Sequence, residues 1–171
     1  MKENKFCALI LAAGKGSRMK SDLAKVLHVL EGKPLLHYCL QSAKSAGAEK
    51  VVVIVGHQAD LVRQEFSQGG CIIVDQKPQL GTGHAVLQAK EVLAGYSGKT
   101  VILCGDVPLL KESTIKLLIE NHIATGAAIT VLTTTPPDAT GYGRIVRDSA
   151  GNIAKIVEQR LAPTLMHHAR N

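Results

Sequence analysis

The chain has 171 residues, 46% of them hydrophobic, and a formal net charge of +6 at pH 7. This length suits one globular domain, and an aromatic content of 3% without Trp requires an aliphatic core, as in α/β folds whose strands are buried on both faces. No basic stripe is interleaved with aromatics and no apolar stretch approaches the roughly 20 residues of a membrane span, which argues against nucleic-acid binding and membrane insertion.

Short apolar runs alternate with segments of helical periodicity along the chain. Strands are expected at 6–11, 51–55, 71–74, 101–104, 127–135, 144–146 and 153–157, and helices at 34–46, 58–66, 81–93 and 112–125. This order predicts an α/β fold with a mostly parallel sheet and helices on both faces. Ligands of such sheets bind beyond the carboxyl ends of the strands, so the residues that follow each strand are the candidate site.

A glycine-containing loop with basic residues follows the first expected strand. Gly14 and Gly16 allow a sharp turn that presents backbone N–H groups to phosphate oxygens. Arg18 and Lys25 can neutralise a triphosphate. The loop is neither a Walker loop nor a dinucleotide fingerprint, because no Gly-Lys-Ser/Thr closes it and Met19 replaces the third glycine. Taken alone, it is equally compatible with an ordinary turn.

The segment after the strand at 71–74 has features of a base pocket. The amide of Gln76 offers a donor and an acceptor for the edge of a base. Gly81 and Gly83 let a base lie close to the backbone, and Thr82 is expected to cap the next helix. His84 is interpreted as a solvated or capping histidine.

Two further groups complete the candidate site. Asp106 directly follows the strand at 101–104, where a carboxylate can hold Mg²⁺ that bridges phosphate oxygens. Alone, Asp106 also fits a simple turn before Pro108. Gly143 would let a sugar approach the backbone, and Glu158 would accept hydrogen bonds from its hydroxyls.

The order and spacing of these groups together are specific. They are the string Leu-Ala-Ala-Gly-Lys-Gly-Ser-Arg-Met at 11–19, Lys25, and the segments 76–85, 105–108, 141–145 and 156–158. The set resembles the N-terminal uridyltransferase domain of the bacterial N-acetylglucosamine-1-phosphate uridyltransferase (GlmU) family. The resemblance covers residues 5 to about 159 and implies a Rossmann-like nucleotidyltransferase domain over 1–159, C-terminally truncated.

The family reaction joins UTP to N-acetylglucosamine 1-phosphate and releases UDP-N-acetylglucosamine, a precursor of peptidoglycan and lipopolysaccharide, and pyrophosphate. The resemblance implies Mg²⁺ at Asp106, sugar contacts from Gly143 and Glu158, and catalytic roles for Arg18 and Lys25. The nucleotide contacts that it implies are Leu11, Ala12, Ala13, Gly14, Lys25, Gln76, Gly81 and Thr82. No side-chain nucleophile is needed, since the attacking phosphate oxygen is already an anion; positioning and charge neutralisation suffice.

The chain also departs from this family. A second metal-ligating Asn and the left-handed β-helix acetyltransferase domain have no counterpart here, so we expect no acetyltransferase activity and impaired turnover. Residues 160–171 no longer resemble the family and are expected to form an atypical, disordered tail. The alternatives are a UTP-binding module without turnover and a related sugar-phosphate or molybdopterin nucleotidyltransferase. A dinucleotide-binding oxidoreductase is a weaker alternative, because this chain lacks the third glycine of that fingerprint.

The cysteines indicate the compartment. All four lie in apolar stretches and none forms a Cys-x-x-Cys pair, which disfavours a zinc knuckle. We therefore expect a reduced, cytoplasmic protein whose partners are UTP and the sugar phosphate, without nucleic acid or membrane.

Overall fold

The computed structural model describes residues 5–16 and 19–158, so Arg18 and the tail at 160–171 lie outside the described residues. The chain divides into two compact units, Met1–Thr130 and Val131–Asn171, which are treated separately below. The first unit contains a four-stranded sheet in the order β5-β4-β1-β6. Its strands are β1 (Phe6–Ala12), β4 (Lys50–Val55), β5 (Ile72–Asp75) and β6 (Lys99–Cys104).

All neighbours in this sheet are parallel, which confirms the expected fold class. β1 lies between β4 and β6. Because successive side chains of a strand point to opposite faces of the sheet, the residues of β1 alternate between two cores. Phe6, Ala8 and Ile10 belong to one core, whereas Cys7 and Leu9 belong to the other. The continuous apolar run of β1 is explained by this burial on both faces.

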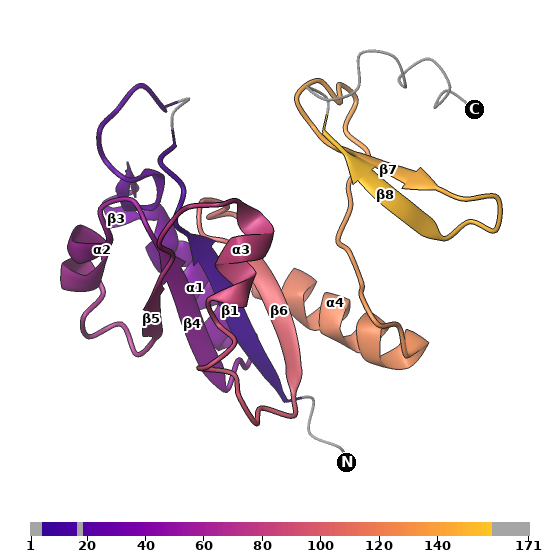
Figure 1. The fold of residues 1–171 in the computed structure, drawn as a ribbon, viewed down its shortest axis with the longest axis horizontal. Helices are drawn as coiled ribbons and strands as arrows, with labels where there is room; N and C mark the ends of the chain where they lie inside the picture. The colour runs from indigo at the N-terminus through magenta and orange to yellow at the C-terminus, as the bar shows by residue number, and fades with distance from the viewer. Residues whose placement is uncertain (1–4, 17–18, 159–171) are drawn as a thin grey trace. The chain divides into compact units, whose positions relative to one another are not determined.

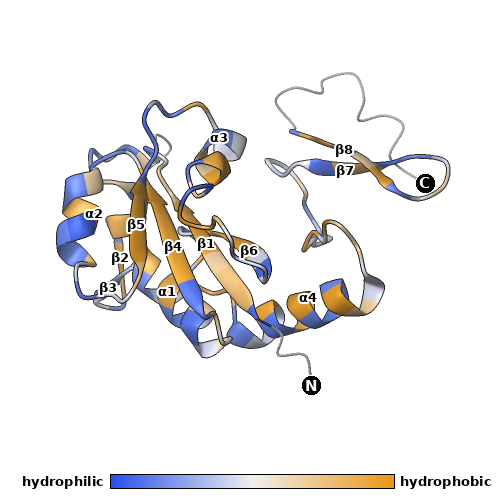
Figure 2. Ribbon diagram, turned by 60° about the horizontal axis from the view of Figure 1, so that its bottom comes forward, coloured by the Kyte–Doolittle hydropathy of each residue, from blue (hydrophilic) through white to orange (hydrophobic). Residues whose placement is uncertain are grey.

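Helices cover both faces of the sheet (Figures 1 and 2). The helices α1 (Leu35–Ser45), α2 (Ala59–Glu65) and α4 (Glu112–Thr125) contribute buried residues to one core. The helix α3 (Thr82–Leu87) contributes Ala85 to the other. None of the described helices is long and apolar enough to cross a membrane.

The helix α3 is shorter than the expected 81–93. Beyond Leu87 the chain continues in turns, in which backbone N–H groups bond to the carbonyl three residues earlier, as from Ala89 to Val86 (3.1 Å). Ala89 and Leu93 still pack against the same core as α3. A spacing of four residues from Ala85 to Ala89 and Leu93 therefore persists without a continuous α-helix.

The expected strand at 127–135 is wrong, because the described backbone there is irregular. Ile129 is 79% exposed and Leu132 is 53% exposed. Among the described residues no strand pairs with this segment, and β-branched composition alone does not hold an extended chain in place.

A two-residue ribbon precedes α1 and was not expected. It pairs β2 (Val29–Leu30) with β3 (Lys33–Pro34) in antiparallel fashion. Glu31 and Gly32, both at positive φ (46° and 79°), form its turn. Pro34 belongs to this ribbon, so the expected helix begins one residue later.

The second unit contains an antiparallel hairpin of β7 (Arg144–Arg147) and β8 (Ile153–Val157). Both strands were expected from the sequence. Asp148 closes the hairpin, because its side chain accepts hydrogen bonds from the backbone N–H groups of Ala150 (3.0 Å) and Asn152 (2.9 Å). These bonds lower the pKa of the exposed Asp148 carboxyl.

Candidate functional site

The loops that follow the four parallel strands meet at one edge of the sheet. Three backbone bonds tie these loops to their neighbours beyond the strand ends. They run from His57 N to Ala13 O (3.2 Å), from Gln76 N to Val55 O (2.7 Å) and from Gly105 N to Leu11 O (2.9 Å). The structure therefore brings together the expected phosphate loop, the expected base segment and the turn that carries Asp106.

Lys25 and Asp106 meet at this edge although they are 81 residues apart in the sequence. The Lys25 Nζ donates to Asp106 Oδ2 in an ion pair. The two side chains are 31% and 30% exposed, so solvent screens the pair and its contribution to stability is small. The ion pair matters because it shows that the expected phosphate-binding cation lies beside the expected metal ligand.

The carboxylate of Asp106 suits Mg²⁺ that is held mainly by a nucleotide. Among the described residues no group of three or more His, Cys, Asp or Glu side chains lies close enough together to bind a metal ion. Mg²⁺ is commonly bound by one or two carboxylates together with substrate phosphates and water. One partly exposed carboxylate at the mouth of a phosphate loop fits that coordination.

Gly16 shapes the phosphate loop and links it to Lys25. Its φ is +66°, and a Cβ added there would lie 2.8 Å from the Lys25 Cβ. Any larger residue at 16 would therefore be strained and would displace the lysine. Gly14 is exposed, and a Cβ there would meet none of the described residues within 4 Å.

Residues after β4 anchor the far end of the phosphate loop, and sequence reasoning missed this role. The Ala24 N–H donates to Gln58 Oε1 (2.7 Å), immediately before Lys25. The His57 Nε2 lies 3.1 Å from Asp22 O. Their position directly after a buried parallel strand was the available signal, although it gave no hint of the partner.

We expect Gln58→Leu to lower the free energy of unfolding by about 1–3 kcal/mol, because the Ala24 N–H then loses its acceptor. Gln58→Glu keeps an oxygen at the same distance along the side chain and should change stability by less than about 0.5 kcal/mol. Urea denaturation of the three proteins measures this difference. Equal losses in both variants would contradict the importance of this hydrogen bond.

Gly56 allows three segments to approach closely at the same edge. A Cβ at this position would lie 2.5 Å from Gln79 Nε2 and 3.0 Å from both the Cβ and the carbonyl oxygen of Ala13. The Gln79 side chain therefore reaches back over the strand ends, next to the predicted nucleotide contacts. The sequence did not indicate this position of Gln79.

The base segment is held by Gln76, which is only 4% exposed. Its Nε2 donates to Gly81 O (2.9 Å) and lies 3.1 Å from His84 Nδ1. His84 is thus half-buried and bonded to Gln76, rather than solvated or capping as expected. Thr82 is also not a cap: Gly81 occupies the N-cap position at a φ of +100°, which favours glycine, and no described side chain caps this helix.

The thiols near the site are neutral. Burial raises the pKa of Cys39 to about 11. Its Sγ lies 3.4 Å from both Cys104 O and Val107 O, on either side of the turn that contains Asp106. Burial, followed by the charge of Asp106, also raises the pKa of Cys104. No thiolate nucleophile is therefore offered by these two cysteines.

The expected sugar contacts lie in the second unit. The register of the hairpin pairs Arg144 with Val157, which brings Gly143 and Glu158 next to each other. A Cβ at Gly143 would lie 3.5 Å from Glu158 Oε1. The structure joins these two residues to each other, and their contact with a sugar stays a prediction.

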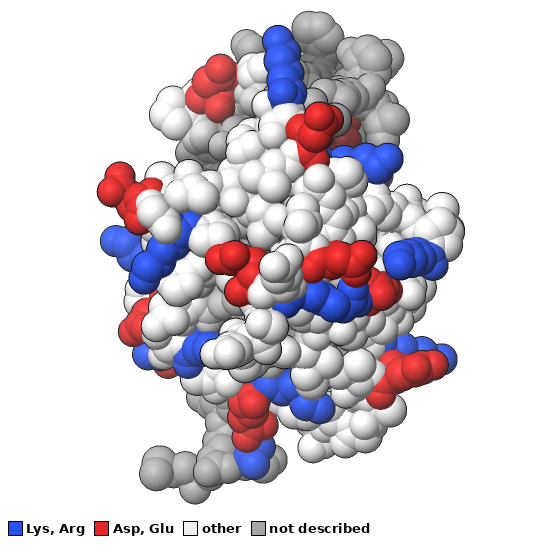
Figure 3. All heavy atoms as spheres, turned by 90° about the vertical axis from the view of Figure 1, so that its left-hand side faces the viewer, with Lys and Arg blue, Asp and Glu red and all other residues white. Residues whose placement is uncertain are grey.

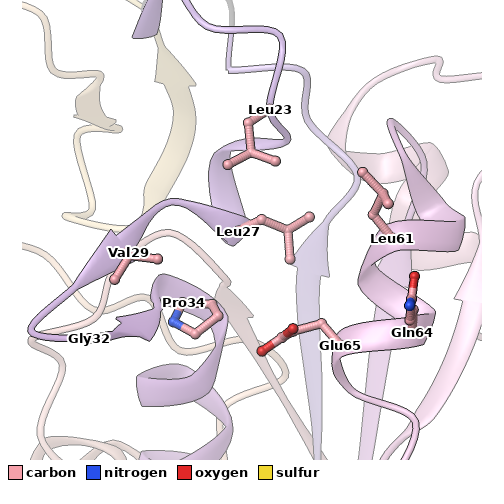
Figure 4. A pocket seen from close by; sticks show the side chains of 8 residues that line it. All are labelled: Leu23, Leu27, Val29, Gly32, Pro34, Leu61, Gln64 and Glu65. Atoms are coloured by element: carbon pink, nitrogen blue, oxygen red, sulfur yellow. The ribbon is translucent and has the colours of Figure 1, made fainter.

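A separate hollow of about 470 Å³ lies beside α2 and the β2–β3 ribbon. Leu23, Leu27 and Leu61 face the same space in Figure 4. None of the predicted site residues lines it, and its lining residues include Glu65 but no Lys or Arg, which does not suit a triphosphate. The face that carries α2 shows Lys and Arg interleaved with Asp and Glu (Figure 3).

Comparisons with known proteins agree with the motifs. Residues 8–168 match the MobA-like NTP transferase domain. A "Bifunctional protein GlmU" from Pelobacter propionicus is 53% identical over 154 residues, which are 90% of this chain and 34% of that protein. The resemblance stated from the motifs is thereby confirmed. The chain spans about a third of the length of such curated relatives.

Solved structures share the fold. A nucleotidyl transferase from Methanothermobacter thermautotroptrophicus superposes with a TM-score of 0.61 at 24% identity, over 68% of this chain and 57% of that one. A Mycobacterium tuberculosis protein solved as a complex with manganese superposes with a TM-score of 0.56 at 21% identity, over 70% of this chain and 60% of that one.

Proposed function

This chain belongs to the family of MobA-like NTP transferase domains, and from that premise we propose that it transfers a uridylyl group from UTP to N-acetylglucosamine 1-phosphate. The products are UDP-N-acetylglucosamine and pyrophosphate, and the reaction depends on Mg²⁺. The uridine and the sugar are proposed from the motifs and from the likeness to the curated GlmU relatives, of which this chain spans about a third. The cytoplasm is the proposed compartment.

The observation that carries the proposal is the meeting of Lys25 and Asp106 at the edge of the sheet. Lys25, which follows the glycine loop, can neutralise phosphate oxygens, and Asp106, which follows β6, can hold the metal ion that a triphosphate carries. Gln76, which follows β5 at the other side of the sheet, supplies a buried amide for the base. Sugar-phosphate nucleotidyl transfer therefore suits the arrangement better than hydride transfer or hydrolysis by a protein nucleophile.

The reaction requires no proton transfer by the protein. A phosphate oxygen of the sugar phosphate forms the new bond to the α-phosphorus of UTP. The bond from that phosphorus to the bridging oxygen breaks, and pyrophosphate leaves with the electron pair. The chain orients the two substrates and neutralises their charge, which is how most phosphoryl-transfer proteins accelerate the step.

Lys25 has the central role among the described residues. Its ammonium group is bonded to Asp106. A bound triphosphate would give the ammonium group new partners in the phosphate oxygens, and Asp106 would then hold Mg²⁺, which would supply positive charge against the phosphates. The neutral thiols of Cys39 and Cys104 take no part in bond formation.

Pyrophosphate release tests the proposal directly. The chain is incubated with UTP, N-acetylglucosamine 1-phosphate and Mg²⁺, and UTP binding is measured in parallel by calorimetry. Release that depends on both substrates supports the transferase. Binding of UTP without release would instead support a nucleotide-binding module, and the absence of both would contradict the proposed function.

The nucleobase separates uridylyl transfer from a related cytidylyl, guanylyl or molybdopterin-type transfer. Binding of UTP, CTP and GTP is compared at one Mg²⁺ concentration. A preference for UTP is expected, and a preference for CTP or GTP would redirect the proposal to another member of the same family.

A further inference from the structure

Gln76 is held in one orientation by two acceptors. It is the only buried polar residue of the described part of the chain, and it directly follows β5. Gly81 O accepts a hydrogen bond from its Nε2 (2.9 Å). A carbonyl oxygen can only accept, so this contact fixes which end of the amide points toward Gly81.

The second hydrogen of the same nitrogen points to His84. The Gln76 Nε2 lies 3.1 Å from His84 Nδ1, and this geometry is favourable only when Nδ1 accepts and the ring proton is on Nε2. The other ring nitrogen lies 3.2 Å from Gln88 Nε2. Gln88 is the less buried of the two glutamines. The Gln88 Nε2 also donates to His84 O (3.0 Å), and the remaining hydrogen of this half-buried amide can reach solvent. Among the described residues, the second amide hydrogen of the buried Gln76 has His84 Nδ1 as its acceptor, so Gln76 requires Nδ1 to be unprotonated.

This arrangement leaves one atom of Gln76 for a ligand. Both amide hydrogens are used within the protein, and Oε1 accepts no hydrogen bond from the described residues. This oxygen is not one of the described side-chain atoms that are buried without a partner, so it stays open to a ligand that can donate to it. A ligand that meets Gln76 should therefore present an N–H group. Uracil carries one at N3, where cytosine has an acceptor; cytosine would have to shift so that its 4-amino group meets the same oxygen.

We propose that His84 determines base selectivity by holding the Gln76 amide with its oxygen toward the nucleotide. The inference rests on the proposed function, because it assigns the base to Gln76. Without an acceptor at His84, the amide loses one of the two bonds that oppose its reversal. A reversed amide would present N–H groups, which match the N3 of cytosine. Loss of His84 thus weakens the preference for uracil over cytosine.

The selectivity ratio tests this role. Dissociation constants for UTP and CTP are measured by calorimetry with Mg²⁺ for wild type, His84→Leu and His84→Asn. The ratio of CTP to UTP dissociation constants should fall roughly 3- to 10-fold in His84→Leu, about the value of one hydrogen bond. Asn places an oxygen near the position of Nδ1 and should keep the ratio close to wild type. Gln88→Leu, on the other side of the ring, should also keep it.

An unchanged ratio in His84→Leu would overturn the inference. A wild-type chain that binds neither nucleotide would contradict the proposed function instead. A measurement on the wild type covers the case in which His84→Leu does not fold. The ¹⁵N NMR shifts of the His84 ring should report a protonated Nε2 and an unprotonated Nδ1, and a protonated Nδ1 would overturn the inference.

Discussion

Asp106→Ala should abolish the Mg²⁺ dependence of nucleotide binding and lower turnover by roughly 100- to 1,000-fold. Asp106 ends the turn after β6 and is the carboxylate that contacts Lys25. The described residues near it supply no cluster of further metal ligands. Without it, Mg²⁺ is bound only by the phosphates, as it is in free solution. The metal ion then no longer strengthens binding of the nucleotide to the protein.

In the absence of Mg²⁺, we expect the same variant not to lose affinity for UTP. Lys25 loses its partner and becomes free to contact phosphate oxygens. UTP binding in the presence of a chelator should consequently be unchanged or stronger in Asp106→Ala. Titration calorimetry with and without Mg²⁺ measures both effects, and Asp60→Ala, at a fully exposed carboxylate on α2, serves as a control for the lost charge. A Mg²⁺ dependence equal to that of wild type would refute the metal assignment.

Lys25→Ala should weaken UTP binding roughly 10- to 150-fold, the value of a hydrogen bond to a charged group. Uridine, which has no phosphate, should bind almost as well as to wild type. The reason is geometric: Lys25 begins a short helical turn, and its Cβ lies against Gly16 of the phosphate loop. We therefore expect its ammonium group to contact phosphates rather than the base.

The comparison of the two ligands separates a direct contact from a general defect. Lys116→Ala removes the same charge from α4, where Lys116 pairs with Glu112 (3.3 Å), and should leave both affinities unchanged. If Lys25→Ala weakens uridine as much as UTP, Lys25 supports the fold of the loop and does not bind phosphate.

Local patterns explain why much of the fold was predictable. The helix at 112–125 was expected with the bounds that α4 has, because Ile115 and Ile119 recur at helical spacing and Gly126 follows the last turn in a left-handed conformation. The apolar runs of β1 and of residues 51–55 in β4 were equally clear, since strands buried on both faces are continuously apolar. Their order then favoured a parallel sheet.

The bounds of other elements depended on contacts that no local pattern encodes. The segment at 127–135 has the composition of a strand, yet among the described residues it finds no neighbouring strand. The region after Leu87 keeps helical spacing but forms turns. In both segments, pairing and packing decided the backbone, and propensity alone was insufficient.

The sequence by itself determined the types of residue at the candidate site and the strand ends on which they lie. It placed Asp106 after one strand and Gln76 after another, because the carboxyl ends of parallel strands share one edge. Only the tertiary structure decided which side chains meet there. The bonds from Lys25 to Asp106 and from Gln76 to His84 depend on loop paths, and loop paths are set by contacts such as that of Gln58 with Ala24, between residues 34 positions apart.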